Sequence, residues 1–390
     1  MSKKLRVGII GVGGIANGKH MPSLAKLDNV EMVAFCDIIK ERAEKGAQQY
    51  GTPDAKVFTD YRDLVALDDL DVVYVLTPND VHSEMTVAAL EAGKHVMCEK
   101  PMAINSEQAL AMVEAAERTG KKLTIGYQNR FRPDSQYLKK LCDAGELGEI
   151  YFAKALAVRR RGVPTWGIFL NAERQGGGPL IDIGTHALDL TLWLTNNYKP
   201  KSVMGVTFRK LADTENAANP WGPWDPKEFT TEDSAFGFIQ FENGMTVILE
   251  ASWALNTLQI GEAMCVLCGT KAGADMFDGL RINGEKFSKL YTTKPDLYGQ
   301  GVAFYEARHQ DAGFAEAKHF IDCIVNDTEP LVKPREAYVV TQILEAIYES
   351  AKTGKPVYFD DACCDDACCD DEECCDDEEC CSDDKDCCDA

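Results

Sequence analysis

The pattern of apolar and polar positions changes character near the middle of the chain. Up to residue 127, short apolar runs alternate with segments whose apolar residues recur every three or four positions, which predicts strands alternating with helices. The predicted strands cover residues 5–10, 30–36, 56–58, 72–76, 95–98 and 123–127, and the predicted helices cover 15–27, 40–50, 61–66, 81–92 and 106–119. This alternation is typical of a parallel sheet with helices on both faces.

Beyond about residue 150 the predicted strands follow one another directly. They cover residues 151–159, 203–209, 235–241, 246–252 and 263–268, with helices at 185–194, 305–326 and 335–353 and a long loop at 212–233. The expected fold class is therefore α/β, with an N-terminal doubly wound parallel sheet of the Rossmann type and a C-terminal α+β domain whose sheet is mostly antiparallel. The domain boundaries are expected at 1–127, 128–359 and 360–390.

Charge is concentrated at the C-terminal end of the sequence. The 390 residues carry a formal charge of −22, but residues 360–390 hold 16 acidic residues and one lysine, so the remainder carries only −7. An acidic chain of this kind argues against a protein that tracks nucleic-acid phosphates. No apolar run is long enough for a membrane span, and no signal peptide is expected, since Met1 to Lys4 lead directly into the first predicted strand.

Cysteine divides in the same way, with six scattered through the body and ten in the tail as five Cys-Cys pairs. Scattered body thiols are typical of reduced, buried cysteines and favour a cytoplasmic location. For the tail, three interpretations stay open: a solvated acidic segment, a redox or assembly element, or a site for soft metals. The metal hypothesis names Cys363, Cys364, Cys368 and Cys369 as ligands, and no metal is expected in the body.

A glycine-rich turn follows the first predicted strand. Gly11-Val12-Gly13-Gly14-Ile15-Ala16 fits the G-x-G-x-x-G/A pattern, in which backbone and a helix N-terminus receive a pyrophosphate. Asp37 ends the second strand, where a carboxylate accepts hydrogen bonds from a ribose 2′-hydroxyl and repels a 2′-phosphate. Because Ile38 and Ile39 follow, without an arginine, the sequence favours NAD over NADP.

Two further segments follow predicted strands at the same edge of the sheet. Thr77, Pro78 and Asn79 are expected to meet the cofactor, and His82 either packs locally or contacts it. Glu99-Lys100-Pro101 follows the fifth strand, so Lys100 is expected to reach a substrate hydroxyl.

Asp182 and His186 stand four residues apart at the entry to a predicted helix. This spacing lets both side chains point into one cavity. Asp189, one turn further on, is predicted to orient the imidazole of His186.

These motifs together resemble the Gfo/Idh/MocA family of nicotinamide-dependent sugar and polyol oxidoreductases over about residues 5–359. The resemblance implies a Rossmann domain beside a domain with a large open sheet, homo-oligomers formed through that sheet, and catalysis by Lys100, Asp182 and His186. It also implies a cis bond before Pro101. The cofactor contacts expected from these motifs are Gly11, Gly13, Gly14, Ile15, Ala16, Asp37, Thr77, Pro78, Asn79, His82, Glu99 and Lys100.

The expected reaction is hydride transfer between nicotinamide and a ring carbinol of a sugar, anhydrosugar, polyol or glycoside, with C3 of a glucoside as one candidate position. His186 accepts the hydroxyl proton, Lys100 polarises the same oxygen, and Asp182 anchors a hydroxyl and keeps Lys100 in place. The substrate-binding residues expected are Lys100, Gln128, Asn129, Arg159, Trp166, Asp182 and His186. Two redox-neutral alternatives stay open, an NAD-dependent glycosidase and a sugar–sugar oxidoreductase.

Overall fold

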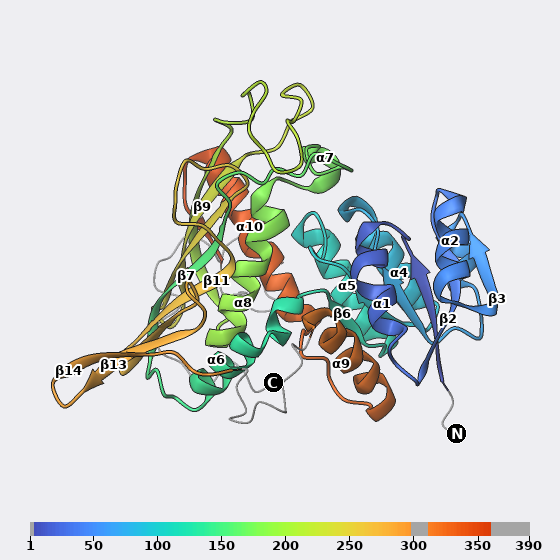
Figure 1. Cartoon of the computed structure of the whole chain (residues 1–390), viewed down its shortest axis with the longest axis horizontal. Coiled ribbons are helices and arrows are strands. Elements are labelled where there is room, and N and C mark those ends of the chain that lie inside the picture. Colours follow the sequence, from blue (N-terminus) through green and yellow to red (C-terminus); the bar gives the residue numbers. More distant parts are fainter. Residues whose placement is uncertain (1–3, 298–310, 360–390) are drawn as a thin grey trace, which may run out of the picture. The chain divides into compact units, whose positions relative to one another are not determined.

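The computed structural model describes residues 4–297 and 311–359. The described residues up to Val357 form one compact unit that contains two sheets (Figure 1). The tail cysteines Cys363, Cys364, Cys368 and Cys369 lie outside the described residues, so their predicted metal site has no structural counterpart here.

The first sheet is parallel and has the strand order β3-β2-β1-β4-β5-β6. Its strands are β1 (Leu5–Ile10), β2 (Val30–Cys36), β3 (Gly51–Phe58), β4 (Val72–Val75), β5 (His95–Cys98) and β6 (Leu123–Ile125). All four residues of β4 are buried, and such a continuous run of buried, largely apolar residues is typical of a strand covered on both faces. The order reverses between β1 and β4, and the carboxyl ends of these strands are where such sheets bind ligands.

Helices connect these strands. They are α2 (Lys40–Tyr50), α3 (Tyr61–Val65), α4 (His82–Glu91) and α5 (Ser106–Thr119), with short 3₁₀ turns at η2 (Asn79–Val81) and η3 (Gln128–Phe131). The single helix predicted at 15–27 is instead a wide π-type turn, η1 (Ala16–His20), followed by the short helix α1 (Met21–Leu24). Pro22 gives the physical reason, because it has no N–H to donate to the carbonyl of Gly18.

The second sheet is mostly antiparallel, apart from the parallel pair of β10 with β7. Within the compact unit its order is β14-β13-β12-β11-β7-β10-β9-β8. The strands are β7 (Ile150–Val158), β8 (Pro200–Phe208), β9 (Ser234–Phe241), β10 (Thr246–Ser252), β11 (Gly261–Gly269), β12 (Ala272–Asp275), β13 (Arg281–Lys286), β14 (Lys289–Thr293) and the two-residue β15 (Val357–Tyr358).

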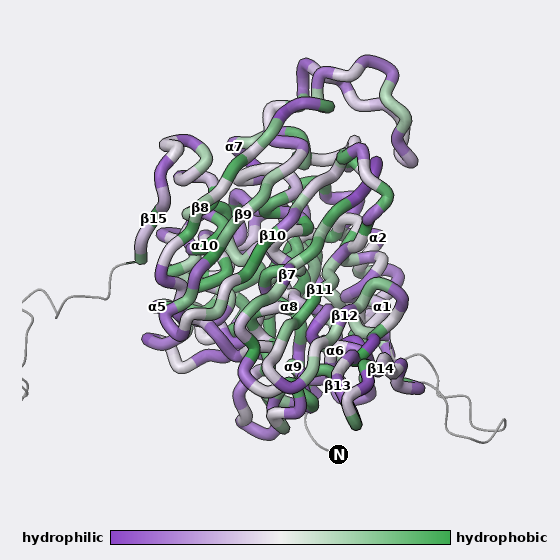
Figure 2. Tube along the Cα trace, turned by 90° about the vertical axis from the view of Figure 1, so that its left-hand side faces the viewer, coloured by the Kyte–Doolittle hydropathy of each residue, from purple (hydrophilic) through white to green (hydrophobic). Residues whose placement is uncertain are grey.

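Among residues 4–297 and 311–359, helices cover one face of this sheet. α8 (Thr185–Thr195) packs on β7 and β11, and α10 (Pro334–Thr353) packs on β8. No described helix covers the opposite face, which Figure 2 shows directly, with β8, β9, β10, β7 and β11 side by side. The remaining elements are α6 (Pro133–Asp143), α7 (Ala172–Gln175), the π-type turn η4 (Leu180–Gly184) and α9 (Ala312–Asn326). The predicted fold class is confirmed.

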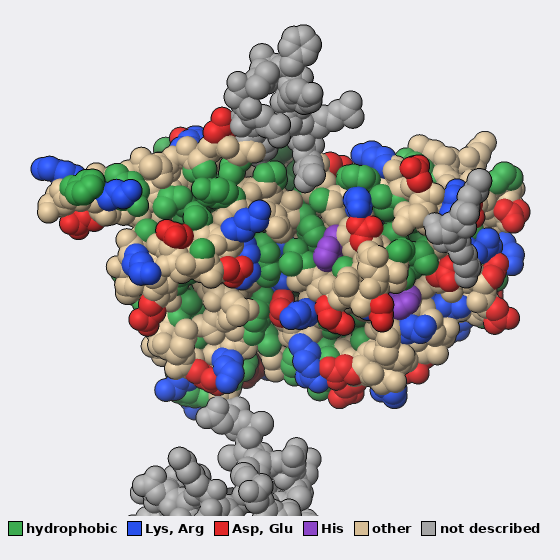
Figure 3. Space-filling view, turned by 90° about the horizontal axis from the view of Figure 1, so that it is seen from below, with side chains coloured by type: hydrophobic (Ala, Val, Ile, Leu, Met, Phe, Trp, Pro, Cys, Tyr) green, Lys and Arg blue, Asp and Glu red, His purple; other side chains and the backbone are tan. Residues whose placement is uncertain are grey.

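The surface of the described residues is mixed in charge. On the face drawn in Figure 3, basic and acidic side chains are intermingled. Across residues 4–297 and 311–359, none of the helices combines the length and the apolar character needed to cross a bilayer.

Candidate active site

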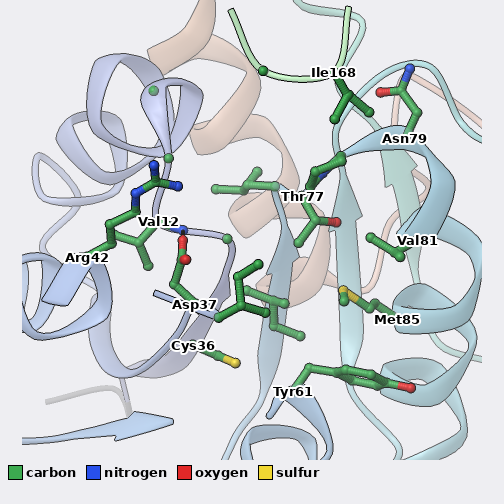
Figure 4. A pocket seen from close by; sticks show the side chains of 18 of the residues that line it. Val12, Cys36, Asp37, Arg42, Tyr61, Thr77, Asn79, Val81, Met85 and Ile168 are labelled. Atoms are coloured by element: carbon green, nitrogen blue, oxygen red, sulfur yellow. Dashed lines mark hydrogen bonds between the residues drawn. The ribbon is translucent and has the colours of Figure 1, made fainter. Parts of the chain in front are cut away.

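A cavity of about 800 Å³ lies at the carboxyl ends of β1 and β4. It is lined on one side by the glycine-rich turn and the end of β2, and on the other by residues 76–81 and Met85. The segment Trp166 to Phe169 and the pair Arg174 and Gln175 from the second half of the chain complete its wall. In Figure 4, Ile168 faces Thr77 across this space.

The glycines of the turn have different reasons to be glycine. Gly11 has φ of +89°, and a Cβ there would lie 2.6 Å from the carbonyl oxygen of Leu76, so the fold itself excludes a side chain. A Cβ at Gly13 or Gly14 would meet no protein atom within 4 Å. Because the chain makes no demand for glycine at these two positions, the open space beside them fits a ligand that approaches the backbone closely, as a pyrophosphate does.

The other predicted contacts of the turn lie outside the cavity. Ile15 is exposed and Ala16 is fully buried, and neither lines it, whereas Asn17 does. Asn17 was not predicted, although it stands on the turn of helix that the motif opens. Its side-chain amide donates to the carbonyl oxygens of Val12 and Gly13 and so holds the turn in shape.

Asp37 secures the far end of the same turn. Its Oδ2 accepts a hydrogen bond from the N–H of Val12 at 2.9 Å (Figure 4). Its Oδ1 accepts one from the N–H of Ile39 at 2.9 Å. Arg42 and Lys45 line the same part of the cavity and were not predicted. Both lie in α2, so the two residues directly after Asp37 do not reveal the positive charge near its carboxylate.

Thr77, Pro78 and Asn79, the residues predicted to meet the cofactor, line the cavity. The amide nitrogen of Asn79 donates to the carbonyl oxygen of Gln175 at 2.9 Å, and Arg174 pairs with Asp80 at 2.8 Å. These two contacts join the second half of the chain to the edge of the parallel sheet directly beside the cavity.

For His82 the sequence left two roles open, local packing and cofactor contact, and the structure shows a packed side chain. It is fully buried and does not line the cavity, and its Nε2 and Nδ1 lie 2.9 Å from the carbonyl oxygen of Thr77 and 2.8 Å from that of Pro101. Two acceptors require two N–H donors, which only the protonated ring provides. Burial works to lower the pKa of His82, but Cys98 and the two carbonyl oxygens together raise it to about 9.

Lys100, Asp182 and His186 come together from β5, η4 and α8. The ammonium of Lys100 lies 2.9 Å from Oδ1 of Asp182 and 2.9 Å from its backbone oxygen, and the indole N–H of Trp253 donates to Oδ2 at 3.0 Å. Burial works to raise the pKa of Asp182, yet Lys100 and Arg159 hold it below its usual value. Trp253 was not predicted, since nothing in its local sequence marks a tryptophan 71 residues away as the partner of Asp182.

His186 is a buried, neutral imidazole. Burial, and then the charge of Lys100, lower its pKa to about 3, so the ring is uncharged near neutral pH. Its Nδ1 is buried and has no hydrogen-bond partner among the described residues. A neutral imidazole has one unprotonated ring nitrogen, which is able to accept a proton.

The predicted role of Asp189 is wrong. Its two oxygens accept hydrogen bonds from Arg130, at 2.6 Å from Nη2 and 3.0 Å from Nε, and both side chains are fully buried. A buried guanidinium requires a buried counter-ion, which takes Asp189 away from His186. Arg130 also pairs with Glu336 at 2.6 Å and therefore serves the core.

Glu99 belongs to a buried ionic cluster and does not line the cavity. Its Oε1 lies 2.5 Å from the ammonium of Lys19 and 2.7 Å from Nε2 of His20, while its Oε2 accepts the N–H of Lys100 at 3.0 Å. Lys19 also pairs with Glu316 of α9 at 3.1 Å. The cluster thus joins the helical segment after the glycine turn to the end of β5, where Lys100 lies. Lys19 and His20 stand one helical turn after Ala16. This spacing from the glycine motif is the sequence feature that could have indicated the ionic cluster.

The remaining predicted substrate-binding residues lie in two segments, η3 and the chain that follows β7. Gln128 accepts a hydrogen bond from Lys19 at 3.2 Å, and Asn129 lies beside it in η3. Arg159 pairs with Glu262 at 2.6 Å, and Trp166 lines the cavity with about half of its surface exposed.

Fold and site geometry define an oxidoreductase that uses a nicotinamide dinucleotide, and comparisons with known proteins agree. The profile of the oxidoreductase family with an NAD-binding Rossmann fold matches residues 5–127, and that of the GFO/IDH/MocA C-terminal domain matches residues 135–275. The chain belongs to the Gfo/Idh/MocA oxidoreductase family.

Similar proteins cover nearly the whole chain. D-glucoside 3-dehydrogenase of Escherichia coli is 38% identical over 358 residues, which is 91% of this chain and 98% of that protein. The scyllo-inositol 2-dehydrogenase (NAD(+)) of Bacillus subtilis is 25% identical over 92% of this chain and 98% of its own length. Among solved structures, aldose-aldose oxidoreductase from Caulobacter crescentus superimposes with a TM-score of 0.74 at 25% identity, covering 92% of this chain and all of the other.

Proposed function

We propose that the protein is an NAD-dependent dehydrogenase that oxidises a ring carbinol of a glucoside, with C3 as the position of attack. The observation that carries the proposal is the contact of Lys100 with Asp182 beside His186, at the edge of the sheet that also forms the nucleotide cleft. The similarity to D-glucoside 3-dehydrogenase over 98% of that protein's length supports the choice of substrate. In this proposal residues 1–127 bind the nucleotide and residues 128–359 bind the sugar.

Each of the three residues has a distinct task. Lys100 donates to the substrate oxygen and favours its alkoxide character. His186 is neutral, so it accepts the hydroxyl proton and returns it in the reverse direction. Asp182 is ionised, so it keeps the ammonium in place and leaves a lone pair for a neighbouring hydroxyl. The nicotinamide, when bound, supplies the hydride acceptor.

The cofactor of the proposal is NAD. The Asp37 carboxylate would repel a 2′-phosphate and accept hydrogen bonds from the ribose, whereas Arg42 and Lys45 at the same end would attract a phosphate. Asp37 lies directly at the turn and is held by two backbone N–H groups, so its charge is fixed in position. NAD(+) also appears in the name of the related scyllo-inositol 2-dehydrogenase.

One observation favours a redox-neutral second candidate. The contacts of Arg174 with Asp80 and of Asn79 with Gln175 close the cavity wall beside the nucleotide cleft. A nucleotide held behind these contacts could remain bound while the sugar is oxidised and then reduced again, as in a sugar–sugar oxidoreductase or an NAD-dependent glycosidase. Such an enzyme would retain its nucleotide through gel filtration and would form no net NADH.

We also propose that the protein assembles into homo-oligomers through the open face of the second sheet. Met204, Val206 and Phe208 alternate with inward residues along β8, and Phe238 on β9 lies opposite Met204 in the register. These side chains are among the exposed large apolar residues of the described chain. A contiguous apolar face of this kind is stabilised when a second copy covers it.

A reduced, cytoplasmic compartment is part of the same proposal. The six body cysteines are all unpaired in the structure, and four of them are buried. Unpaired thiols in this number suit a reducing environment.

The test of the proposed function is NADH formation, followed by its near-ultraviolet absorbance, with methyl glucosides, free hexoses, inositols and anhydrosugars as substrates. We expect a methyl glucoside to be oxidised with NAD, and a keto group at C3 in the isolated product. Nucleotide that stays bound through purification, with aglycone release and no NADH, would instead support the redox-neutral candidate.

A further inference from the structure

Two of the five tryptophans are exposed, in contrast to the other three. Trp166 and Trp221 have 51% and 46% of their surface exposed, whereas Trp193, Trp224 and Trp253 have at most 6% exposed. Indole is among the largest apolar surfaces that a side chain offers, and adjacent exposed indoles are typical of a binding surface.

A continuous row of aromatic rings connects this pair to the proposed catalytic residues. Trp253, which donates to Asp182 at 3.0 Å, packs against Phe169 with ring centroids 6.4 Å apart. Phe169 packs edge-on against Trp166 at 5.8 Å, and Trp166 packs edge-on against Trp221 at 5.0 Å. The row therefore begins beside Asp182 and ends at exposed surface. A substrate whose reacting ring lies at Asp182 would extend along this row toward the surface.

The two exposed indoles are held in fixed positions. They stand on two loops joined by hydrogen bonds in both directions between the backbone of Val163 and the side chain of Asn219, and by the Thr165 hydroxyl donating to the carbonyl oxygen of Trp221. The N–H of Thr230 donates to the carbonyl oxygen of Leu170 further along. A platform that is rigid before a ligand arrives loses little conformational entropy on binding.

Polar groups flank the platform. The Arg159 guanidinium lies 5.6 Å from the ring centroid of Trp221 and pairs with Glu262, whose side chain is 46% exposed. A pyranose ring has an apolar C–H face that packs on indole and hydroxyl groups that bind guanidinium and carboxylate groups. An aryl group would use the indole and leave these charged groups unused, so the combination fits a sugar ring better.

We propose that Trp166, Trp221 and the Arg159–Glu262 pair form an outer subsite that binds the second sugar ring of a disaccharide. The inference rests on the proposed function, because it takes the first ring to lie at Lys100, Asp182 and His186. It makes disaccharides, and not free hexoses, the substrate class of the enzyme. Trp166 also lines the nucleotide cavity, but Trp221 does not, so Trp221 is the position to test.

The experiment compares cellobiose with methyl β-glucoside, and maltose with methyl α-glucoside, by KM and by calorimetric Kd. In wild type we expect the disaccharide that fits the subsite better to have a lower KM and a lower Kd than the methyl glucoside with which it is compared. Trp221→Ala should raise the ratio of disaccharide to methyl glucoside values by roughly two- to tenfold, the range expected for loss of one ring contact, and Trp221→Phe should restore most of it. Tyr137→Ala, which removes an exposed aromatic ring from α6, should give the wild-type ratio.

The outcomes separate this inference from the proposed function. An unchanged ratio in a folded Trp221→Ala protein overturns the subsite, as does wild type with no preference for either disaccharide. An effect confined to nitrophenyl glucoside assigns the platform to an aryl group and also overturns the second-ring proposal. Disaccharide binding that depends on Trp221 without any turnover supports the subsite and contradicts the dehydrogenase.

Discussion

The ammonium of Lys100 and the carboxylate of Asp182 lie 2.9 Å apart, although 82 residues separate them in the sequence. Lys100 ends a strand of the parallel sheet, and Asp182 stands in the turn that opens α8. The pair therefore links the half of the chain that forms the nucleotide cleft to the half that forms the open sheet. Its geometry fixes the ammonium of Lys100 at the end of β5.

Removing either partner should reduce turnover far more than nucleotide affinity. We expect Lys100→Ala and Asp182→Asn each to lower kcat about a hundred- to ten-thousandfold, because the first removes the group that polarises the oxygen and the second releases it. The nucleotide Kd, measured by fluorescence titration, should change little, since neither side chain lines the cavity. Lys199→Ala, an exposed lysine, is the control. Equal losses in kcat and nucleotide affinity would contradict the assigned roles.

Replacing Asp37 should change cofactor preference. Asp37→Asn keeps an acceptor for the N–H of Val12 but removes the charge that repels a 2′-phosphate, while Arg42 and Lys45 remain in place. We expect the ratio of kcat/KM for NAD to that for NADP to fall by about tenfold or more. Glu41→Gln makes the same charge change on an exposed side chain of α2 that does not line the cavity. A ratio that moves equally in both variants would contradict the role of Asp37.

His82 should make stability depend on pH in the alkaline range. Its pKa is raised from 6.5 to about 9, so the folded state holds a proton that the unfolded state has lost between these values. The stabilisation is complete below about pH 6.5 and is lost as pH rises through 9, and it amounts to about 3 kcal/mol. His82→Gln has no such proton. The difference between wild type and this variant in urea unfolding free energy should shrink over that window, and a constant difference would contradict a protonated His82.

The local motifs were predictable because each is a short pattern with one structural solution. The glycine turn, the lysine after β5 and the Asp182 and His186 pair all lie at strand or helix ends that hydrophobic periodicity locates. The partners of these residues were not predictable. Glu316 reaches Lys19 across 297 residues and Trp253 reaches Asp182 across 71, and no local pattern encodes such contacts.

The contact of Asp189 could not be predicted from the sequence either. Its spacing from His186 suggested a contact, but spacing along a helix says nothing about a competing group from another segment. The buried guanidinium of Arg130 lies within hydrogen-bonding distance, and an unpaired buried charge costs more than an unoriented imidazole. The electrostatic demand of Arg130 therefore decides where Asp189 points.

The oligomer proposal has a direct test in Phe238. This side chain is 46% exposed, and on the sheet it lies opposite Met204 on β8 and Ile248 on β10. We expect wild type to elute from gel filtration with light scattering as an oligomer, and Phe238→Glu to shift to a smaller species because it places a charge in the apolar interface. Val325→Glu on α9, at a position that is 57% exposed and lies outside the sheet, should not shift. A monomeric wild type would contradict the proposal.

The central claim is that hydride leaves a ring carbon of a glucoside under the control of Lys100, Asp182 and His186. The most direct measurement is the fate of deuterium placed at C3 of a methyl glucoside, followed by NMR of both products with wild type and His186→Ala. The account predicts deuterium in the reduced nucleotide and a turnover that the variant largely loses. Deuterium retained in the sugar, or unchanged turnover in His186→Ala, would contradict it.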